Sequence, residues 1–215
     1  MNKVEKIMST LLKEFKVYRK PTVRRTSAKK SPFKTLISCL LSLRCKDENT
    51  AKASASLFAV ADTPDGILKI PIKKLEKLIY SSGYYKNKAK SIKHVCRVLL
   101  DEYQGKVPRT REELLAIKGI GPKTCNIVLC FAYGQNVIPV DTHVHRIPNR
   151  LGWVKTKTPE ESEVELMRVV PKKYWREINT TFILFGQNVC LPISPKCSVC
   201  SINKLCPRIN VVKSR

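Results

Sequence analysis

The chain has 215 residues, with 41 Lys and Arg against 17 Asp and Glu, for a formal net charge of +24 at pH 7 and an isoelectric point near 9.9. So large a basic excess favours a polyanionic partner, because basic side chains gain affinity by displacing counterions from phosphates, and it argues against charge that serves solubility alone. A membrane partner is disfavoured, since the sequence has no long basic amphipathic helix and no apolar run of about 18 residues. Glu5 and Glu14 in the amphipathic N-terminal stretch argue against a signal peptide, so we expect an intracellular protein.

Apolar residues recur at helical spacing along most of the chain, and capping residues precede many of these segments. An alternating pattern typical of strands is weak and confined to residues 136–140. The sequence therefore predicts an all-α fold of one or two small domains. The expected helices cover residues 4–15, 32–43, 47–58, 72–80, 87–103, 142–151, 158–170 and 174–189, with a short helix from residue 63 and two helices around a glycine turn at 119–121.

The segment 16–30 carries seven basic residues, no acidic residue and Pro21. We interpret it as a linker or arm, which either contacts phosphate or is a solvated tail. The next helix, 32–43, is apolar on most sides, which predicts that it is buried. Asp47 is expected to cap the helix that follows.

The stretch 110–134 predicts two short helices joined by a tight turn, in which Gly119 and Gly121 bracket Ile120. Glycine allows positive φ and leaves backbone N–H groups uncovered, so we expect both glycines to turn the chain. Pro122 suits the first position of the second helix, which places Lys123 in its first turn. The positive end of the helix dipole there favours a free amine, as a nucleophilic lysine requires.

Asp141 follows an apolar extended segment and is predicted to be the N-cap of the next helix. A capping carboxylate accepts backbone N–H bonds and so favours its charged form. A neutral amine at Lys123 and a charged carboxylate at Asp141 would suit a catalytic pair. The alternative is a solvated lysine and a carboxylate that only caps a helix.

Nine cysteines fall into two sets. Five lie singly in helical segments, where buried free thiols are expected. The other four, Cys190, Cys197, Cys200 and Cys206, have the spacing C-x6-C-x2-C-x5-C near the end of the chain. Four thiolates at this spacing can bind one tetrahedral zinc or an iron–sulfur cluster, and two disulfides are the weakest alternative in an intracellular protein. His143 and His145 could suggest a second metal site, but they lack a third ligand.

The run KGIGPKT (118–124) followed by VDTH (140–143) resembles the helix-hairpin-helix and Gly/Pro-Asp signature of the endonuclease III family of DNA glycosylases. The resemblance covers nearly the whole chain. It implies that Lys123 is the nucleophile, that Asp141 assists it, and that Gly119 and Gly121 present N–H groups to DNA phosphate. It implies two helical domains: a six-helix barrel at 25–135 with the hairpin, and an iron–sulfur domain built from 1–24 and 136–215. The active site would lie in the cleft between the domains.

The same resemblance identifies the four clustered cysteines as ligands of a [4Fe–4S] cluster that fixes a DNA-contacting loop. That loop reads LPISPK, and Lys196 is its only charged residue. In this family, side chains from two further loops fill the gap that an extruded nucleotide leaves. Those positions hold Arg44, in SLRCKD, and Tyr84, in GYYKNKA. Bacterial relatives typically carry Gln and Leu there, so opposite-base preference is open, and both residues could instead be ordinary surface residues.

The resemblance implies a base-excision-repair DNA glycosylase with AP lyase activity, which removes oxidised pyrimidines through a Schiff base on Lys123. Lysine at this position is typical of the bifunctional class. Two alternatives remain: a mismatch or purine glycosylase of the same superfamily, and a non-catalytic helix-hairpin-helix DNA-binding protein. The expected partner is double-stranded DNA with a damaged base or an abasic site, bound by a monomer in the cytoplasm or nucleoid.

Overall fold

The computed structural model describes residues 2–27 and 31–215, and every regular element in these ranges is helical. The expected all-α fold is confirmed, and residues 136–140 form no strand. The chain divides into two compact units, one comprising the segment up to Pro21 with Asn136–Arg215, the other Thr22–Gln135. No helix among the described residues is both long and apolar enough to span a bilayer.

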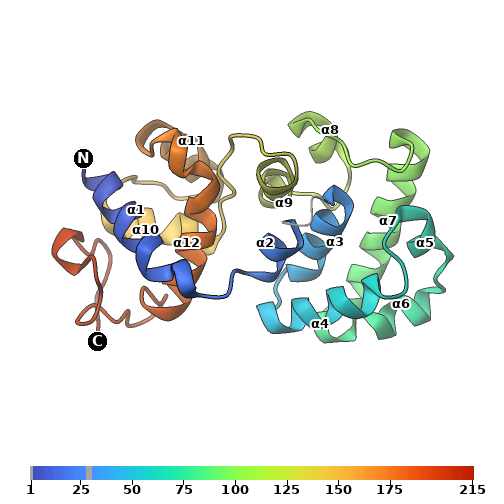
Figure 1. Cartoon of the computed structure of the whole chain (residues 1–215), viewed down its shortest axis with the longest axis horizontal. Helices are drawn as coiled ribbons and strands as arrows, with labels where there is room; N and C mark the ends of the chain where they lie inside the picture. Colours follow the sequence, from blue (N-terminus) through green and yellow to red (C-terminus); the bar gives the residue numbers. More distant parts are fainter. Residues whose placement is uncertain (1, 28–30) are drawn as a thin grey trace. The chain divides into compact units, whose positions relative to one another are not determined.

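The unit Thr22–Gln135 is organised around α3 (Pro32–Ser42), in which Phe33 and the seven consecutive residues from Thr35 to Leu41 are buried. As the sequence predicts, this helix is apolar on most sides, and it packs against α2, α4, α7 and α9 (Figure 1). The remaining helices of this unit pack against α4, α7 or α9. Their bounds are α2 Thr22–Ser27, α4 Asp47–Phe58, α5 Pro64–Lys69, α6 Ile72–Leu78, α7 Tyr85–Tyr103, α8 Arg111–Ala116 and α9 Pro122–Ile127, with a π-helical continuation Val128–Ala132 and a 3₁₀ turn Tyr80–Ser82.

Two expectations for the segment before α4 are wrong. Residues 22–27, assigned to a linker or arm, form α2, and residues 28–30 of that segment lie outside the described residues. Asp47 does not cap α4, whose N-cap residue is Lys46. Its carboxylate instead accepts the backbone N–H of Thr22 at 2.8 Å and the Thr22 hydroxyl at 2.9 Å. This contact ties α2 to α4, so the boundary between the units falls after Pro21, whereas the sequence placed it after residue 24.

The other unit joins the two ends of the chain. It contains α1 (Lys3–Glu14), α10 (Thr142–Leu151), α11 (Pro159–Val169) and α12 (Trp175–Asn188), and α12 packs against both α1 and α10 (Figure 1). Its core combines apolar residues from the two ends of the sequence. They include Ile7, Met8, Leu11, Val144, Ile147, Leu151, Leu166, Ile178, Phe182 and Phe185.

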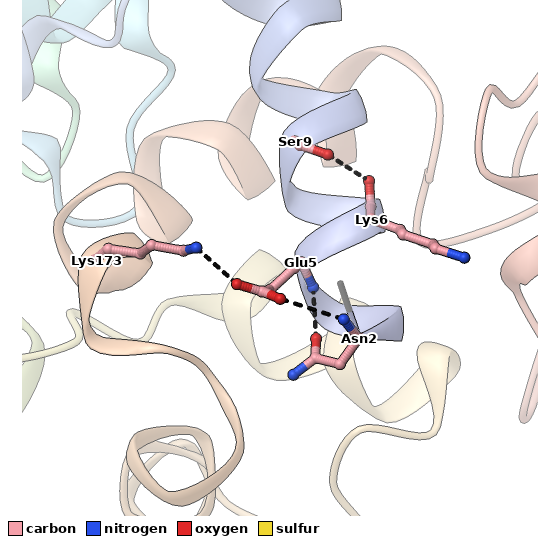
Figure 2. Close-up of polar contacts among 5 residues, drawn as sticks. All are labelled: Asn2, Glu5, Lys6, Ser9 and Lys173. Carbon is pink, nitrogen blue, oxygen red and sulfur yellow. Dashed lines mark hydrogen bonds and ion pairs between the residues drawn. The ribbon is translucent and has the colours of Figure 1, made fainter.

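Polar contacts at the start of α1 reinforce this union (Figure 2). The Asn2 side chain accepts the N–H of Glu5 at 2.9 Å, and the Glu5 carboxylate accepts the N–H of Asn2 at 3.2 Å, which completes a capping box. Glu5 also accepts a hydrogen bond from Lys173 at 2.6 Å, and this bond is the main cause that lowers the pKa of Glu5. Residues 168 positions apart are thereby joined.

We predict that Phe182→Ala lowers the free energy of unfolding by about 3–5 kcal/mol, because it leaves a cavity in a closed core. Phe182 has no exposed surface, and its ring lies 5.7 Å from that of Trp153. Urea denaturation followed by circular dichroism measures the change. Val164→Ala on α11 is the matched control, since 52% of Val164 is exposed and its removal should change stability by less than about 0.5 kcal/mol. Equal effects of the two substitutions would contradict this account of the core.

Candidate functional site

The hairpin predicted at 110–134 consists of α8, a turn and α9. Thr110 is the N-cap of α8, and its hydroxyl oxygen accepts the N–H of Glu113 at 3.3 Å. The turn closes with the Ile120 N–H donating to the Ile117 carbonyl at 3.0 Å. Arg111 connects the two helices by donating to the Asn126 side chain at 2.6 Å. Local capping and one side-chain bridge therefore define the hairpin.

The two glycines of this turn differ in conformation. Gly119 has φ +99, which favours glycine, and a Cβ there would lie 2.9 Å from Ser91 Oγ, so the Ser91 hydroxyl would have to move. Gly121 has an extended backbone with φ −96 and is the N-cap of α9, and a Cβ there would meet nothing within 4 Å. The expectation that both glycines turn the chain is correct for Gly119 and wrong for Gly121. A glycine cap has no side chain over the first N–H groups of the helix, so these groups stay uncovered.

Lys123 is the second residue of α9, as the sequence predicts, and its side chain is partly buried. It lies close enough to Cys39 of α3 to act on that thiol electrostatically. Burial raises the pKa of Cys39 to about 12, and the positive charge of Lys123 opposes this shift. Lys123 thus stands against the most buried helix of its unit, whereas Lys118 is exposed.

Asp141 is confirmed as the N-cap of α10. Its Oδ1 atom accepts the N–H groups of His143 and Val144, both at 2.9 Å, and only 8% of the residue is exposed. Neither of these bonds uses Oδ2. Burial is the main cause that lowers the pKa of Arg146, one turn further along α10, and the charge of Asp141 partly opposes this shift. A nearly buried carboxylate is therefore held at a helix start with one oxygen committed to the backbone.

His143 and His145 have partners other than a metal. His145 Nδ1 lies 2.7 Å from the Ser162 hydroxyl, and His143 Nδ1 lies 3.1 Å from the Arg146 guanidinium. The His143 ring also packs on Gly186, where a Cβ would lie 2.2 Å from Nδ1. Within residues 2–27 and 31–215, no three or more His, Cys, Asp or Glu side chains are arranged as ligands of one metal ion.

The four C-terminal cysteines nevertheless line one cavity, and all four are free thiols, as are the other five cysteines. The two-disulfide alternative is therefore not what the structure contains. Burial raises the pKa of Cys200 to about 11 and also raises that of Cys206, and the charges of neighbouring cysteines add to both shifts. These cysteines are thus close enough to interact as thiolates, which is the form that binds metal.

Backbone and side-chain donors surround these sulfurs. Arg150 of α10 donates to Cys190 Sγ at 3.4 Å and, at 2.6 Å each, to the carbonyls of Leu191 and Pro192. The Arg208 N–H donates to Cys206 Sγ at 3.4 Å. N–H groups directed at sulfur are the outer-shell contacts that stabilise thiolate ligands of iron–sulfur clusters. The donor set therefore fits a four-thiolate group.

The remaining predicted contact residues are on the surface. Arg44 and Tyr84 are both exposed, and both line one hollow of about 350 Å³ with Lys88 and Asn87. Both also have positive φ, +50 for Arg44 and +47 for Tyr84, a conformation that costs a non-glycine residue about 1–2 kcal/mol. Lys196, in the cysteine loop, is exposed and donates its backbone N–H to the Val189 carbonyl at 3.0 Å. The structure thus brings Arg44 and Tyr84 to the same hollow.

Sequence reasoning missed Lys88, which is 7% exposed and whose ammonium donates to two backbone carbonyls. A signal was present, because Lys88 falls on the apolar stripe of α7 together with Ile92 and Val95. It also missed Arg150, a buried cation in the last turn of α10.

Comparison with known proteins accords with this geometry. Residues 37–172 match the family described as HhH-GPD superfamily base excision DNA repair protein. The chain is 43% identical over 203 residues to endonuclease III of Thermotoga maritima, covering 94% of this chain and 92% of that protein. It is 41% identical over 190 residues to endonuclease III-like protein 1 of Mus musculus, which covers 87% of this chain but only 61% of that longer protein.

Two solved structures are similar over nearly the whole chain. One is a trapped endonuclease III–DNA covalent intermediate, an estranged-adenine complex, with a TM-score of 0.81, 35% identity and coverage of 97% of each chain. The other is a thermostable thymine-DNA glycosylase, with a TM-score of 0.83, 28% identity and coverage of 96% of each chain. Backbone similarity alone does not separate these two enzymes. Sequence identity separates them, because it is 43% to endonuclease III of Thermotoga maritima and 28% to the thymine-DNA glycosylase. The chain belongs to the endonuclease III family of the HhH-GPD superfamily.

Proposed function

We propose that this chain is a bifunctional DNA glycosylase and AP lyase of base excision repair, acting on oxidised pyrimidines in duplex DNA. The observation that carries the proposal is a lysine in the first turn of the second hairpin helix of an endonuclease III-family chain. A covalent intermediate has been trapped with DNA in a structure similar to this chain over 97% of its length. A lysine amine that forms a Schiff base with the sugar fits such a trapped intermediate.

The substrate nucleotide must leave the duplex before its sugar can be attacked, at a cost of a few kcal/mol. The uncovered N–H groups near Gly119 and Gly121 would bind backbone phosphate, as would Lys196, without reading sequence. The charge of +24 supports a polyanionic partner of this kind. Arg44 could then bond the orphaned base and Tyr84 could stack on it.

The reaction would begin with the neutral amine of Lys123 attacking C1′ of the extruded nucleotide. The N–C1′ bond forms as the bond to the base breaks, and the base leaves with the electron pair and takes up a proton. The Asp141 carboxylate would stabilise the positive charge that develops on the sugar. The nitrogen then loses a proton, and the C1′–O4′ bond breaks as O4′ takes up a proton, which gives the protonated Schiff base. Its positive charge acidifies C2′, and loss of the C2′ proton expels the 3′ phosphate by β-elimination.

We further propose that Cys190, Cys197, Cys200 and Cys206 hold a [4Fe–4S] cluster. The chemistry that it supplies is structural: it would fix the cysteine loop, including Lys196, for DNA contact. The chain would act as a monomer on genomic DNA, in the cytoplasm or nucleoid. A mismatch glycosylase is the second candidate, favoured by the equally close backbone match to a thymine-DNA glycosylase. A panel of duplexes with oxidised pyrimidines, G·T mismatches and damaged purines separates the two.

Lys123→Gln should abolish borohydride trapping on abasic-site DNA and should abolish strand cleavage, because the nucleophile is lost. DNA affinity, measured by fluorescence anisotropy, should change little. Lys118→Gln is the matched control: this exposed lysine of the same turn can contribute only a phosphate contact, on the order of 1 kcal/mol of binding free energy. Trapping by Lys123→Gln at near wild-type yield would move the nucleophile elsewhere.

Asp141→Asn should slow base removal by roughly 100-fold or more, since a neutral amide stabilises the developing cation poorly. The amide oxygen can still accept the N–H groups of His143 and Val144, so α10 keeps its cap. Single-turnover kinetics on a damaged base and on a preformed abasic site measure the two steps separately. The abasic-site reaction should retain part of its rate. Unchanged base removal would exclude a catalytic role for Asp141.

Protein purified without oxygen should be yellow-brown and contain about four irons and four sulfides per chain. Cys206→Ser should lose the visible absorbance, because one of four ligands is gone. Cys45→Ser, which changes a partly exposed cysteine outside this group, should keep it. Stoichiometric zinc without visible absorbance would contradict the cluster and support the zinc alternative.

A further inference from the structure

Lys88 is a buried cation that joins two separate segments of backbone. Its Nζ donates to the carbonyl of Leu41 and to the carbonyl of Ser82, both at 2.7 Å. The residue is 7% exposed, and burial is the main cause that lowers its pKa. Removing an ammonium from water costs free energy that its hydrogen bonds must offset, and an apolar side chain could fill the same space without that cost.

The two carbonyls lie two and three residues before Tyr84 and Arg44, which are exposed and border the hollow. Leu41 is in the last turn of α3, three residues before Arg44. Ser82 ends the 3₁₀ turn Tyr80–Ser82, two residues before Tyr84. Arg44 and Tyr84 both have positive φ, so each segment turns sharply just after the carbonyl that Lys88 holds. A non-glycine residue keeps such a conformation only where its surroundings enforce it.

The same face of α7 also supports the hairpin. Ser91 lies one turn after Lys88, and its Oγ occupies the space next to Gly119, where a Cβ would lie 2.9 Å away. Lys88 and Ser91 both line the hollow between Arg44 and Tyr84. One helix face therefore lies against three of the segments to which DNA contacts are assigned: those of Arg44, Tyr84 and the hairpin turn.

We propose that Lys88 is a positioning residue that sets the spacing of the Arg44 and Tyr84 segments, so that both side chains enter the duplex together when a nucleotide is extruded. The inference rests on the proposed function for its DNA readout. Its structural part, that one ammonium holds both segments, is independent of that function. A mispositioned pair of wedges would slow nucleotide extrusion, because a displacement of about 1 Å can cost about 100-fold in rate.

The first test measures the segments in the DNA-free protein. Lys88→Met keeps the aliphatic stem and removes the ammonium, and Lys90→Met removes an exposed lysine from the same helix. Hydrogen–deuterium exchange should accelerate at residues 43–45 and 83–84 in Lys88→Met and stay unchanged in Lys90→Met. Lys88→Arg keeps a cationic donor and should restore slow exchange. Unchanged exchange in Lys88→Met would overturn the proposal.

The second test measures the reaction. Lys88→Met should slow single-turnover base removal from duplex DNA by about 10- to 100-fold. It should also delay the fluorescence change of 2-aminopurine placed opposite the lesion. Borohydride trapping on an abasic site in single-stranded DNA, where there is no gap to fill, should stay within about twofold of wild type.

A double-mutant cycle separates positioning from general stability. In an Arg44→Ala/Tyr84→Ala background, Lys88→Met should have less than about a twofold further effect, since the groups that it positions are gone. A full additional loss there, or an equal loss on single-stranded DNA, would assign Lys88 a general structural role and refute the proposal. Absence of trapping and base removal in the wild-type protein would refute the proposed function instead, and the exchange measurement would then decide the role of Lys88.

Discussion

The unpaired N–H groups at helix starts are the constraint on which the candidate active site depends. Each helix begins with N–H groups that have no partner within the helix. In α10 the Asp141 carboxylate accepts two of them, which orients a nearly buried carboxylate at a defined point. In α9 the cap is Gly121, which has no side chain, and Lys123 follows two residues later. Of the two residues assigned to catalysis, Asp141 is therefore positioned by capping a helix start, whereas Lys123 lies in the first turn of a helix whose start has no side-chain cap.

Helix α10 connects Asp141, which has a proposed catalytic role, with the cysteine loop. Asp141 caps its start, and Arg150 in its last turn donates to Cys190 Sγ and to two carbonyls of the loop. Beyond α12 the chain has little regular structure of its own, with one 3₁₀ turn at Asn203–Leu205. Hydrogen bonds from α10 therefore help to hold this segment in a single conformation, and the proposed ligation by four thiolates would add to them.

A different kind of restraint operates at the surface of the unit Thr22–Gln135. Arg44 and Tyr84 have positive φ without being glycine, and both follow backbone held by the buried ammonium of Lys88. A flexible loop would lose conformational freedom each time it entered DNA, whereas a loop already held in one conformation loses little. Arg44 and Tyr84 differ in what they can bond or stack on from the Gln and Leu that the family resemblance implies for bacterial relatives.

The sequence by itself determined the features that depend on neighbours in the chain. Helical periodicity, the Thr110 and Asp141 caps, and the first-turn position of Lys123 are all local, so they were predicted correctly. The tertiary structure decided what depends on residues far apart: the bond of Asp47 to Thr22 in place of a cap, and the burial of Lys88 between Leu41 and Ser82. It also placed Ser91 against Gly119 and left Gly121 extended. The apolar stripe of α7 indicates that Lys88 is buried, but no pattern in a single sequence identifies the partners in these contacts, because each partner is set by the packing of helices and not by spacing along the chain.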